Sequence, residues 1–272
     1  MGKTHPNSYF LELYERGLEI ISKDEIDELE KETIEKIKKV DAYYNKTCIS
    51  YSAGKDSIVL QNLINKSGIS HRPVMWMTIY QYPSFLNWLK DHEPRKLHIE
   101  ILSKPTWLQL ENESDLLFCK TPDANTYWMA QKWKAQNSYL KDNNFDLLIT
   151  GRRLGDGNNC GSKKKLYVRK AKNYDIFSPL AEWSYEQVFG YIRHRNLSLP
   201  PHYFYKDGFI HGSGAWAERI SYGLADKTDN EHWKELYLRE PQIVIEAANY
   251  LSSAKMFLKG QTKNENRDCK TF

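Results

Sequence analysis

The pattern of apolar and polar positions predicts strands that alternate with helices through the first half of the chain. Short β-rich runs predict strands at 47–51, 73–78, 98–102 and 145–150. Apolar positions at helical spacing predict helices between them at 57–66, 84–92 and 127–141. Strands that alternate with helices imply right-handed crossovers and a parallel sheet. We therefore expect a doubly wound, mostly parallel α/β sheet.

Helical patterns also flank this region. Ser22 and Glu25 form a capping box that opens a helix before the first strand. Ser184 is placed to cap a helix at 184–195, and a helical pattern at 229–258 breaks at Pro241. These patterns predict a helical lead-in at 1–45, an α/β domain at 46–216 and a helical C-terminal region at 217–272. The polar residues 259–272 predict a loose tail.

Composition narrows the class of protein. The chain has 272 residues and 40% apolar content, enough for one main α/β domain with a small appendage. A net charge of +4, from 39 basic and 35 acidic residues, does not by itself imply a nucleic-acid partner. No stretch approaches the roughly 18 apolar residues that span a bilayer. We expect a cytoplasmic protein without a membrane segment.

The cysteines are few and far apart. They stand at Cys48, Cys119, Cys160 and Cys269. No pair has the C-x-x-C spacing typical of zinc ribbons or iron–sulfur clusters. Free thiols are the expected state.

The residues that follow the first predicted strand form a candidate phosphate site. They read Ser52, Ala53, Gly54, Lys55, Asp56, Ser57. Glycine lets the backbone turn tightly and present its amides to an anion, and the N-terminus of the following helix adds unpaired N–H groups. Lys55 adds a mobile cation, and Ser52 and Ser57 add hydroxyl donors. The loop is not a Walker A loop, because no Gly stands five residues before Gly54 and the lysine is followed by Asp instead of Ser or Thr.

Asp56 indicates a metal at this loop. A carboxylate beside a bound triphosphate is repulsive unless a cation lies between them, so Asp56 suggests Mg²⁺ held together with phosphate oxygens. The alternative is that Asp56 interacts with the N-terminus of its own helix. Asp156 is a weaker metal candidate.

Three motifs resemble a known family. The loop resembles the pyrophosphatase loop (PP-loop) of the adenine nucleotide α-hydrolases, which bind ATP on a Rossmann-like sheet of the HUP type and cleave it between the α and β phosphates. The run that ends in Gly151-Arg152-Arg153, and the segment that begins Pro179-Leu180 and contains Trp183, are similar to the branch of phosphoadenylylsulfate (PAPS) reductases and the small subunit of ATP sulfurylase.

The expected topology gathers these residues. In a parallel sheet the ligand lies beyond the carboxyl ends of the strands, so the turns at 52–57 and 151–156 should face one another. The loop would hold pyrophosphate, with Gly151 beside it. Arg152 and Arg153 would clamp the α-phosphate through their planar guanidinium groups. His211 is a candidate donor at the other end of the substrate.

The intact Lys55-Asp56 pair favours an ATP-dependent enzyme. The resemblance implies an adenylyltransferase of sulfate metabolism that joins AMP to a small anionic acceptor and releases pyrophosphate, with ATP and Mg²⁺ as cofactors. Lys55, Arg152 and Arg153 would carry catalysis mainly by positioning and charge stabilisation.

Two other functions stay open. Reductases of this branch use a cysteine near the C-terminus, and Cys269 has a similar position but lacks the family's Gly and His. A sulfonucleotide reductase with Cys269 as nucleophile is therefore the second hypothesis. The third is a nucleotide-binding subunit of a nucleic-acid modification complex. Its basic residues at 163–172, which lie in a predicted mobile loop at 154–173, would dock a partner subunit, a second copy or nucleic acid.

Overall fold

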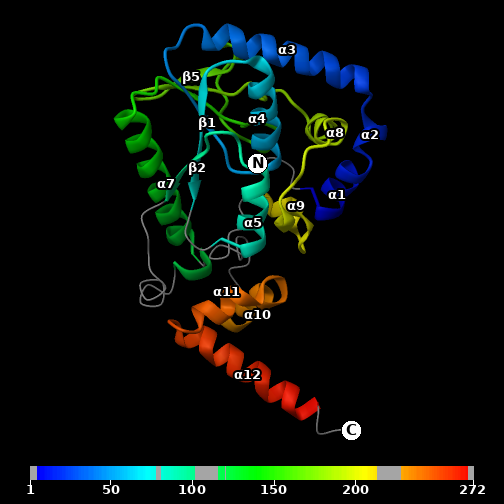
Figure 1. Cartoon of the computed structure of the whole chain (residues 1–272), viewed down its shortest axis with the longest axis vertical. Coiled ribbons are helices and arrows are strands. Elements are labelled where there is room, and N and C mark those ends of the chain that lie inside the picture. The colour runs from blue at the N-terminus through cyan, green and yellow to red at the C-terminus, as the bar shows by residue number, and fades with distance from the viewer. Residues whose placement is uncertain (1–4, 78–80, 102–115, 120, 213–227, 269–272) are drawn as a thin grey trace. The chain divides into compact units, whose positions relative to one another are not determined.

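The computed structural model describes residues 5–77, 81–101, 116–119, 121–212 and 228–268 (Figure 1). The chain divides into two compact units. The first comprises Met1–Met77, Leu89–Glu100 and Lys134–Ser213, and the second comprises Thr78–Trp88, Ile101–Trp133 and Gly214–Phe272. Each unit therefore gathers segments that are distant in the sequence.

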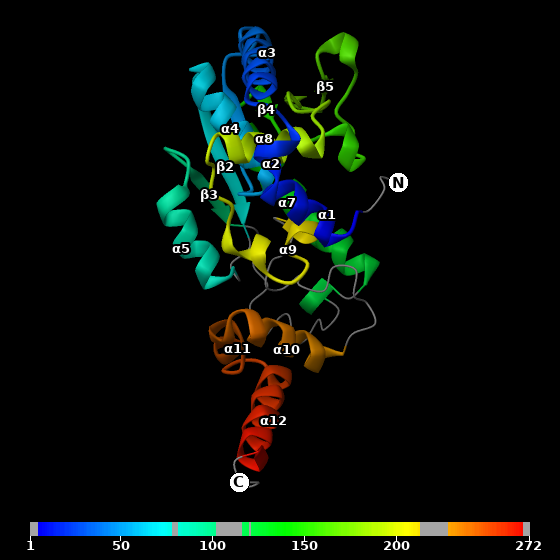
Figure 2. The ribbon, with the colours of Figure 1, turned by 90° about the vertical axis from the view of Figure 1, so that its right-hand side faces the viewer.

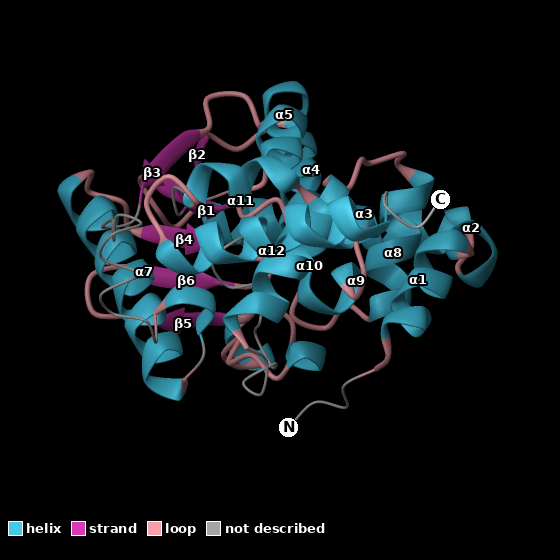
Figure 3. Ribbon diagram, turned by 90° about the horizontal axis from the view of Figure 1, so that it is seen from below, coloured by secondary structure: helices cyan, strands magenta, loops and turns pink. Residues whose placement is uncertain are grey.

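A six-stranded sheet forms the centre of the first unit (Figure 3). Its strands in chain order are β1 (Thr47–Ser50), β2 (His71–Met77), β3 (His98–Ile101), β4 (Leu147–Ile149), β5 (Val168–Lys170) and β6 (Asp175–Phe177). Their order across the sheet is β3-β2-β1-β4-β6-β5. β1 pairs in parallel with β2 and β4, β4 pairs in parallel with β6, and only β5 is shown to be antiparallel to its neighbour among the pairings described. This arrangement confirms the predicted doubly wound, mostly parallel sheet.

Helices cover both faces of this sheet (Figure 1). On one face lie α3 (Lys23–Asp41), α4 (Lys55–Ser67) and α8 (Tyr185–His194), which contact one another. α7 (Pro122–Asp142) lies on the other face, and α5 (Pro83–His92) connects β2 to β3. α1 (Asn7–Glu15) and α2 (Gly17–Ile20) pack against α8 (Figure 2).

The local signals read from the sequence explain where the long helices begin. Ser22 accepts the N–H of Glu25 while the Glu25 side chain accepts from the Ser22 backbone, and Ser184 and Gln187 make the same reciprocal pair at α8. Both capping boxes satisfy N–H groups that a helix start leaves unpaired. The core strands are apolar on both sides because helices cover both faces, so Ile49, Leu147 and Ile149 are fully buried.

The region predicted as a mobile loop contains more order than expected. Residues 154–173 include η2 (Leu154–Asp156), η3 (Lys163–Lys165) and the edge strand β5. The prediction of a mobile loop did not anticipate these short elements. The elements are three residues long, which is too short for periodicity to reveal them.

The second unit contains a helical C-terminal region. It comprises α10 (Asp229–Arg239), α11 (Pro241–Ala247) and α12 (Ser252–Asp268), with Pro241 at the expected break. Trp233, Val244 and Ala247 are fully buried between these helices. We expected a loose tail from residue 259, whereas α12 continues to Asp268. Polar residues do not end a helix that has already nucleated.

The order of the strands in the sheet indicates where the functional site lies. The chain leaves β1 toward β2 on one side, and β4 lies on the other side of β1. The loops that follow β1 and β4 therefore leave the sheet on either side of this switch point, where open α/β sheets bind ligands. Among the described residues, no helix has the length and apolar character needed to cross a bilayer.

Candidate functional site

The loop between β1 and α4 turns at Ala53. Ala53 is fully buried and has a φ of 54°, in the left-handed region that alanine rarely adopts. Gly54 is the N-cap of α4 and has extended backbone, with φ −77° and ψ 156°. The tight turn that we expected at glycine is therefore made by Ala53, and Gly54 leads into the helix.

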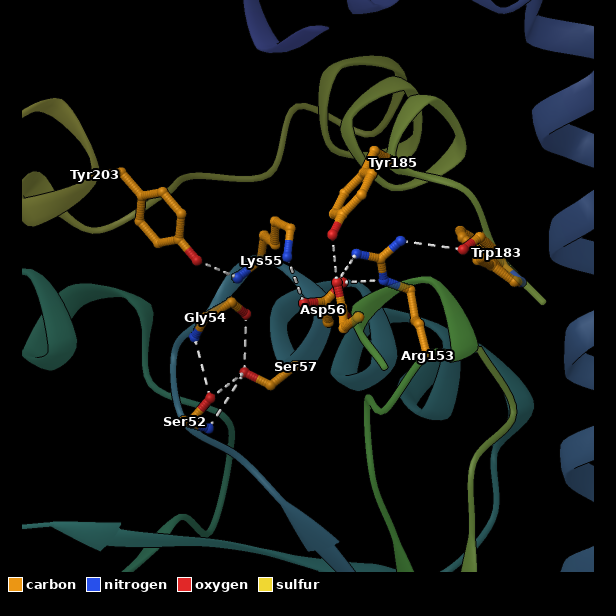
Figure 4. Close-up of polar contacts among 10 residues, drawn as sticks. Ser52, Gly54, Lys55, Asp56, Ser57, Arg153, Trp183, Tyr185 and Tyr203 are labelled. Carbon is orange, nitrogen blue, oxygen red and sulfur yellow. Dashed lines mark hydrogen bonds and ion pairs between the residues drawn. The ribbon is translucent and has the colours of Figure 1, made fainter. Parts of the chain in front are cut away.

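The two serines of the loop hold its shape (Figure 4). Ser57 Oγ accepts the N–H of Ser52 at 3.2 Å and donates to the Gly54 carbonyl at 2.9 Å. Ser52 Oγ accepts the N–H of Gly54 at 3.4 Å and lies 3.3 Å from Ser57 Oγ. These hydroxyls therefore bond the loop's own backbone in this structure.

Tyr203 reaches the same loop from η4 (Pro201–Phe204). Its hydroxyl oxygen accepts the N–H of Lys55 at 2.7 Å. Lys55 is the first residue of α4, so this N–H is one of the helix donors that have no partner within the helix.

A chain of charges connects the loop to the turn after β4 (Figure 4). Lys55 Nζ lies 2.7 Å from Asp56 Oδ2, and Arg153 Nε lies 2.8 Å from Asp56 Oδ1. Arg153 Nη2 lies 2.7 Å from Asp156 Oδ1, and Nη1 donates to the Trp183 carbonyl at 3.1 Å. Arg153 thus joins the helix that begins at Lys55 to the turn that contains Asp156.

Tyr185 covers the Arg153 guanidinium. The ring centre of Tyr185 lies 4.2 Å from Arg153 Cζ, and the hydroxyl donates to Asp156 at 2.8 Å. The Arg153 side chain has no exposed surface, which favours a planar guanidinium that can stack and make several hydrogen bonds together.

The cations keep Asp56 ionised. Burial by itself would raise the pKa of Asp56, but the charges of Lys55 and Arg153 outweigh it and hold this pKa below its ordinary value. Burial would likewise lower the pKa of Arg153, yet Asp56 and Asp156 raise it above its ordinary value. Both partners are therefore charged at neutral pH.

Gly151 allows the two turns to approach. A Cβ atom at Gly151 would lie 3.0 Å from the carbonyl carbon and oxygen of Asp56. Together with the Arg153–Asp56 bond, this contact confirms that the turns at 52–57 and 151–156 face one another.

Arg152 lies in different surroundings from Arg153. The backbone at Arg153 is extended, so neighbouring side chains point in opposite directions. Burial and the nearby Arg169 lower the pKa of Arg152, which also lies near Cys160. In this structure Arg153 binds carboxylates of the protein, whereas Arg152 lies near Arg169 and Cys160. A joint clamp of the two arginines on the α-phosphate stays a prediction.

The Asp56 carboxylate can hold a cation. Its Oδ2 oxygen contacts the Lys55 ammonium in this structure, so the position already has the charge complementarity that Mg²⁺ requires. Among the described residues, no group of three or more His, Cys, Asp and Glu is placed to hold a metal ion. A metal here would need phosphate oxygens as further ligands.

The structure leaves one predicted nucleophile undescribed and adds residues that sequence reasoning missed. Cys269 lies outside the described residues, and His211 is half-buried at the end of α9 (Gly208–His211). Tyr185 and Tyr203 were not predicted as site residues. The position of Tyr185 directly after the Ser184 cap was a usable signal, and Tyr203 belongs to the segment beginning at Pro179 that resembles the family.

Comparisons with known proteins agree with the resemblance. The family model described as phosphoadenosine phosphosulfate reductase domain matches residues 46–211. A crystal structure of phosphoadenylyl-sulfate (PAPS) reductase from Candida auris, in complex with phosphate, is similar with a TM-score of 0.50. It shares 16% identity and covers 66% of this chain and 90% of the other, a likeness that shows the fold alone. A search of curated proteins gives no match.

Proposed function

Since the chain belongs to the phosphoadenosine phosphosulfate reductase domain family, we propose that it is an adenine-nucleotide enzyme that uses ATP and cleaves it between the α and β phosphates. The observation that carries this proposal is the loop 52–57, which opens α4 at the switch point and retains Lys55 and Asp56. A triphosphate would use both residues, Lys55 as a cation for the phosphates and the Asp56 carboxylate to hold a metal ion. A sulfonucleotide has no β,γ-diphosphate to place at this loop.

The reaction is a displacement at the α-phosphorus. An oxygen of a small anionic acceptor attacks this phosphorus and forms a new P–O bond. The bond from the α-phosphorus to the oxygen that bridges it to the β-phosphate breaks, and its electron pair leaves with pyrophosphate. AMP is thereby joined to the acceptor.

The protein's part is to bind and neutralise the phosphate chain. Lys55 leaves Asp56 and contacts the β and γ phosphates, where the N-terminus of α4 also favours negative charge. Arg153 keeps Asp56 and Asp156 in place, so it acts as a positioning residue. Positioning and electrostatic stabilisation supply most of the rate enhancement in reactions of this class.

Asp56 would hold Mg²⁺ in the complex with ATP. Once Lys55 has moved to the phosphates, Asp56 Oδ2 is the oxygen that lacks its cation. The metal would neutralise charge on the phosphate chain.

A sulfonucleotide reductase is the second candidate, and the name of the matching family favours it. In that reaction the Cys269 thiolate attacks the sulfur of the sulfonucleotide, the S–O bond breaks and the adenosine phosphate leaves. A second thiol, acting as reductant, then attacks the Cys269 sulfur and releases sulfite.

One experiment separates the two candidates. The purified protein is incubated with ATP and Mg²⁺, with and without sulfate, and in parallel with a sulfonucleotide and a dithiol. We expect AMP products and pyrophosphate in the first reaction, and the same rate for Cys269→Ser. Sulfite release that Cys269→Ser abolishes, without any pyrophosphate from ATP, would establish the reductase instead.

A further inference from the structure

Tyr203 occupies a position that a bound phosphate chain needs. Its hydroxyl oxygen accepts the N–H of Lys55 at 2.7 Å, and an anion at the N-terminus of α4 would accept the same N–H (Figure 4). A short, linear bond from this N–H has one acceptor, and sharing it between two oxygens would lengthen or bend both bonds. A phosphate oxygen that bonds this N–H fully therefore competes with the Tyr203 hydroxyl.

Other donors of the loop are bonded within it. The amides of Ser52 and Gly54 bond to the hydroxyls of Ser57 and Ser52, and the Lys55 ammonium pairs with Asp56. Partners from outside the loop include Arg153, which binds the Asp56 carboxylate, and Tyr203, which binds a backbone N–H of the loop from 148 positions along the chain. Its contact therefore couples the loop to a distant segment.

The ring of Tyr203 is fixed by its packing. It is 2% exposed, and Phe209 packs edge-on against it at 5.5 Å between ring centres. A Cβ at Gly208 would lie 2.2 Å from the His202 carbonyl oxygen, so α9 and η4 approach as closely as glycine allows. A rotation of the Tyr203 ring alone has little room, and release of the hydroxyl needs a shift of this segment.

Helix α1 holds the same segment in place. The side-chain oxygen of Asn7 accepts the backbone N–H groups of Phe209 and Ile210 at 3.0 and 3.2 Å. These bonds tie the start of α9 to α1. The position of the Tyr203 hydroxyl is therefore set by elements outside the loop.

We propose that Tyr203 is a latch that competes with the phosphate chain for the Lys55 amide and so lowers the affinity of the loop for polyphosphates. The inference rests on the proposed function, because the latch has a competitor only if phosphates bind at 52–57. The phenol stays neutral, since burial raises the pKa of Tyr203 above its ordinary value. The bond it makes to the Lys55 amide is thus weaker than that of a charged phosphate oxygen, and the ligand can replace it.

The test is the variant Tyr203→Phe, which keeps the packed ring and removes the hydroxyl. Calorimetric titration with inorganic pyrophosphate and with ATP should show affinity that is about twofold to tenfold higher than in the wild type, because the free protein no longer has this hydrogen bond to break. Tyr191→Phe is the matched control. Tyr191 is also buried, but its hydroxyl bonds Glu30 and Asn62 away from the loop, so its affinity should be unchanged.

Lys55→Ala separates this inference from the proposed function. If Lys55→Ala weakens binding while Tyr203→Phe leaves it unchanged or weaker, the latch is wrong and the proposed site stands. If the wild type, Lys55→Ala and Tyr203→Phe bind neither ligand, both ideas are wrong. Binding by Tyr203→Phe, with no binding by the wild type or by Lys55→Ala, would support both the latch and the proposed site.

A measurement on the wild type guards against a variant that does not fold. With ¹³C-labelled tyrosine, pyrophosphate should shift the ring signals of Tyr203 over the same concentrations at which the ligand binds. Unchanged Tyr203 signals at saturation would overturn the latch.

Discussion

A single buried guanidinium holds the candidate site together. Arg153 contacts Asp56 from the loop, Asp156 from the facing turn and the carbonyl of Trp183. Because its side chain is fully buried, each of these contacts is shielded from water and the charges would be costly to leave unpaired. The geometry of the phosphate loop therefore depends on a residue that lies 97 positions away from Asp56.

Replacing Arg153 should destabilise the protein. Arg153→Met leaves Asp56 and Asp156 without their shared cation, so we expect the free energy of unfolding to fall by about 3–5 kcal/mol. Urea denaturation measures this change. Arg16→Met is the control: Arg16 makes ion pairs with Glu12 and Glu19 at the surface, and exposed pairs contribute little to stability. Equal effects of the two substitutions would contradict a structural role for Arg153.

Replacing Lys55 should weaken nucleotide binding. Lys55→Ala removes one charge-assisted contact to phosphate, worth about 1.5–3 kcal/mol, so the affinity for ATP should fall about tenfold to a hundredfold. Lys23→Ala, which removes an exposed lysine paired with Asp27 on α3, should leave affinity unchanged. Calorimetry that finds the same affinity for wild type and Lys55→Ala would place the phosphates elsewhere.

The ionised state of Asp56 predicts a pH dependence. Its pKa in the folded protein lies below the ordinary value of 3.8, so its ion pairs stabilise the fold above that value and are lost as the pH falls through the lower folded pKa. The wild type should therefore be more stable than Asp56→Asn by a constant amount above about pH 5, and the difference should shrink at lower pH. A difference that stays constant down to about pH 2 would show that Asp56 does not titrate in this way.

At the scale of elements, close approach of the β4 turn to α4 depends on Gly151. Gly151→Ala places a Cβ 3.0 Å from the Asp56 backbone, and such overpacking should cost about 1–3 kcal/mol and also lower the affinity for ATP. Gly155→Ala is the matched control, because its Cβ would have no neighbour nearer than Arg153 Nη1 at 4.0 Å and its φ is not positive. Thermal unfolding and ATP titration of both variants test this, and a Gly155→Ala variant as impaired as Gly151→Ala would refute the packing argument.

The sequence was most informative where a local signal coincides with an element boundary. The capping residues Ser22 and Ser184 identified the starts of their helices. The helix predicted at 57–66 begins earlier, at Lys55, so the start of α4 was located only approximately. β5 and β6 were not predicted, because three residues show no detectable alternation. β4 is equally short but lies within the apolar run predicted as a strand at 145–150. The left-handed turn at Ala53 was also missed, since the sequence offered a glycine next to it.

At the scale of the whole molecule, the place of the site depends on the order of the strands in the sheet. Local sequence signals support this order but do not determine it. Alternating elements predicted that the loops after β1 and β4 meet, and the Gly151–Asp56 contact confirms it. Which arginine would face the loop was not predictable. Arg153 lies in extended backbone, where consecutive side chains point in opposite directions, and the sequence does not say which one points toward the loop. Tyr203 was missed as a site residue for a related reason: it stands in a segment that resembles the family, but this resemblance does not indicate its contact with Lys55.

Whether Cys269 takes part in the reaction also belongs to the scale of the whole molecule. Cys269 follows α12, and the phosphate site is built entirely from residues of the first unit. Cys269→Ser should therefore leave both the melting temperature and the rate of ATP cleavage at wild-type values, since changes in the last few residues of a chain usually affect stability little. A loss of ATP cleavage in this variant would bring Cys269 into the mechanism.

The bond that is cleaved in ATP tests the central claim most directly. The protein is incubated with Mg²⁺, sulfate and ATP labelled in the γ-phosphate, and the labelled products are separated. Cleavage between the α and β phosphates predicts that the label appears in pyrophosphate, with an equal amount of AMP, free or joined to the acceptor, and that Lys55→Ala slows both. Label in orthophosphate with ADP as the other product, or ATP left intact while a sulfonucleotide yields sulfite, would contradict it.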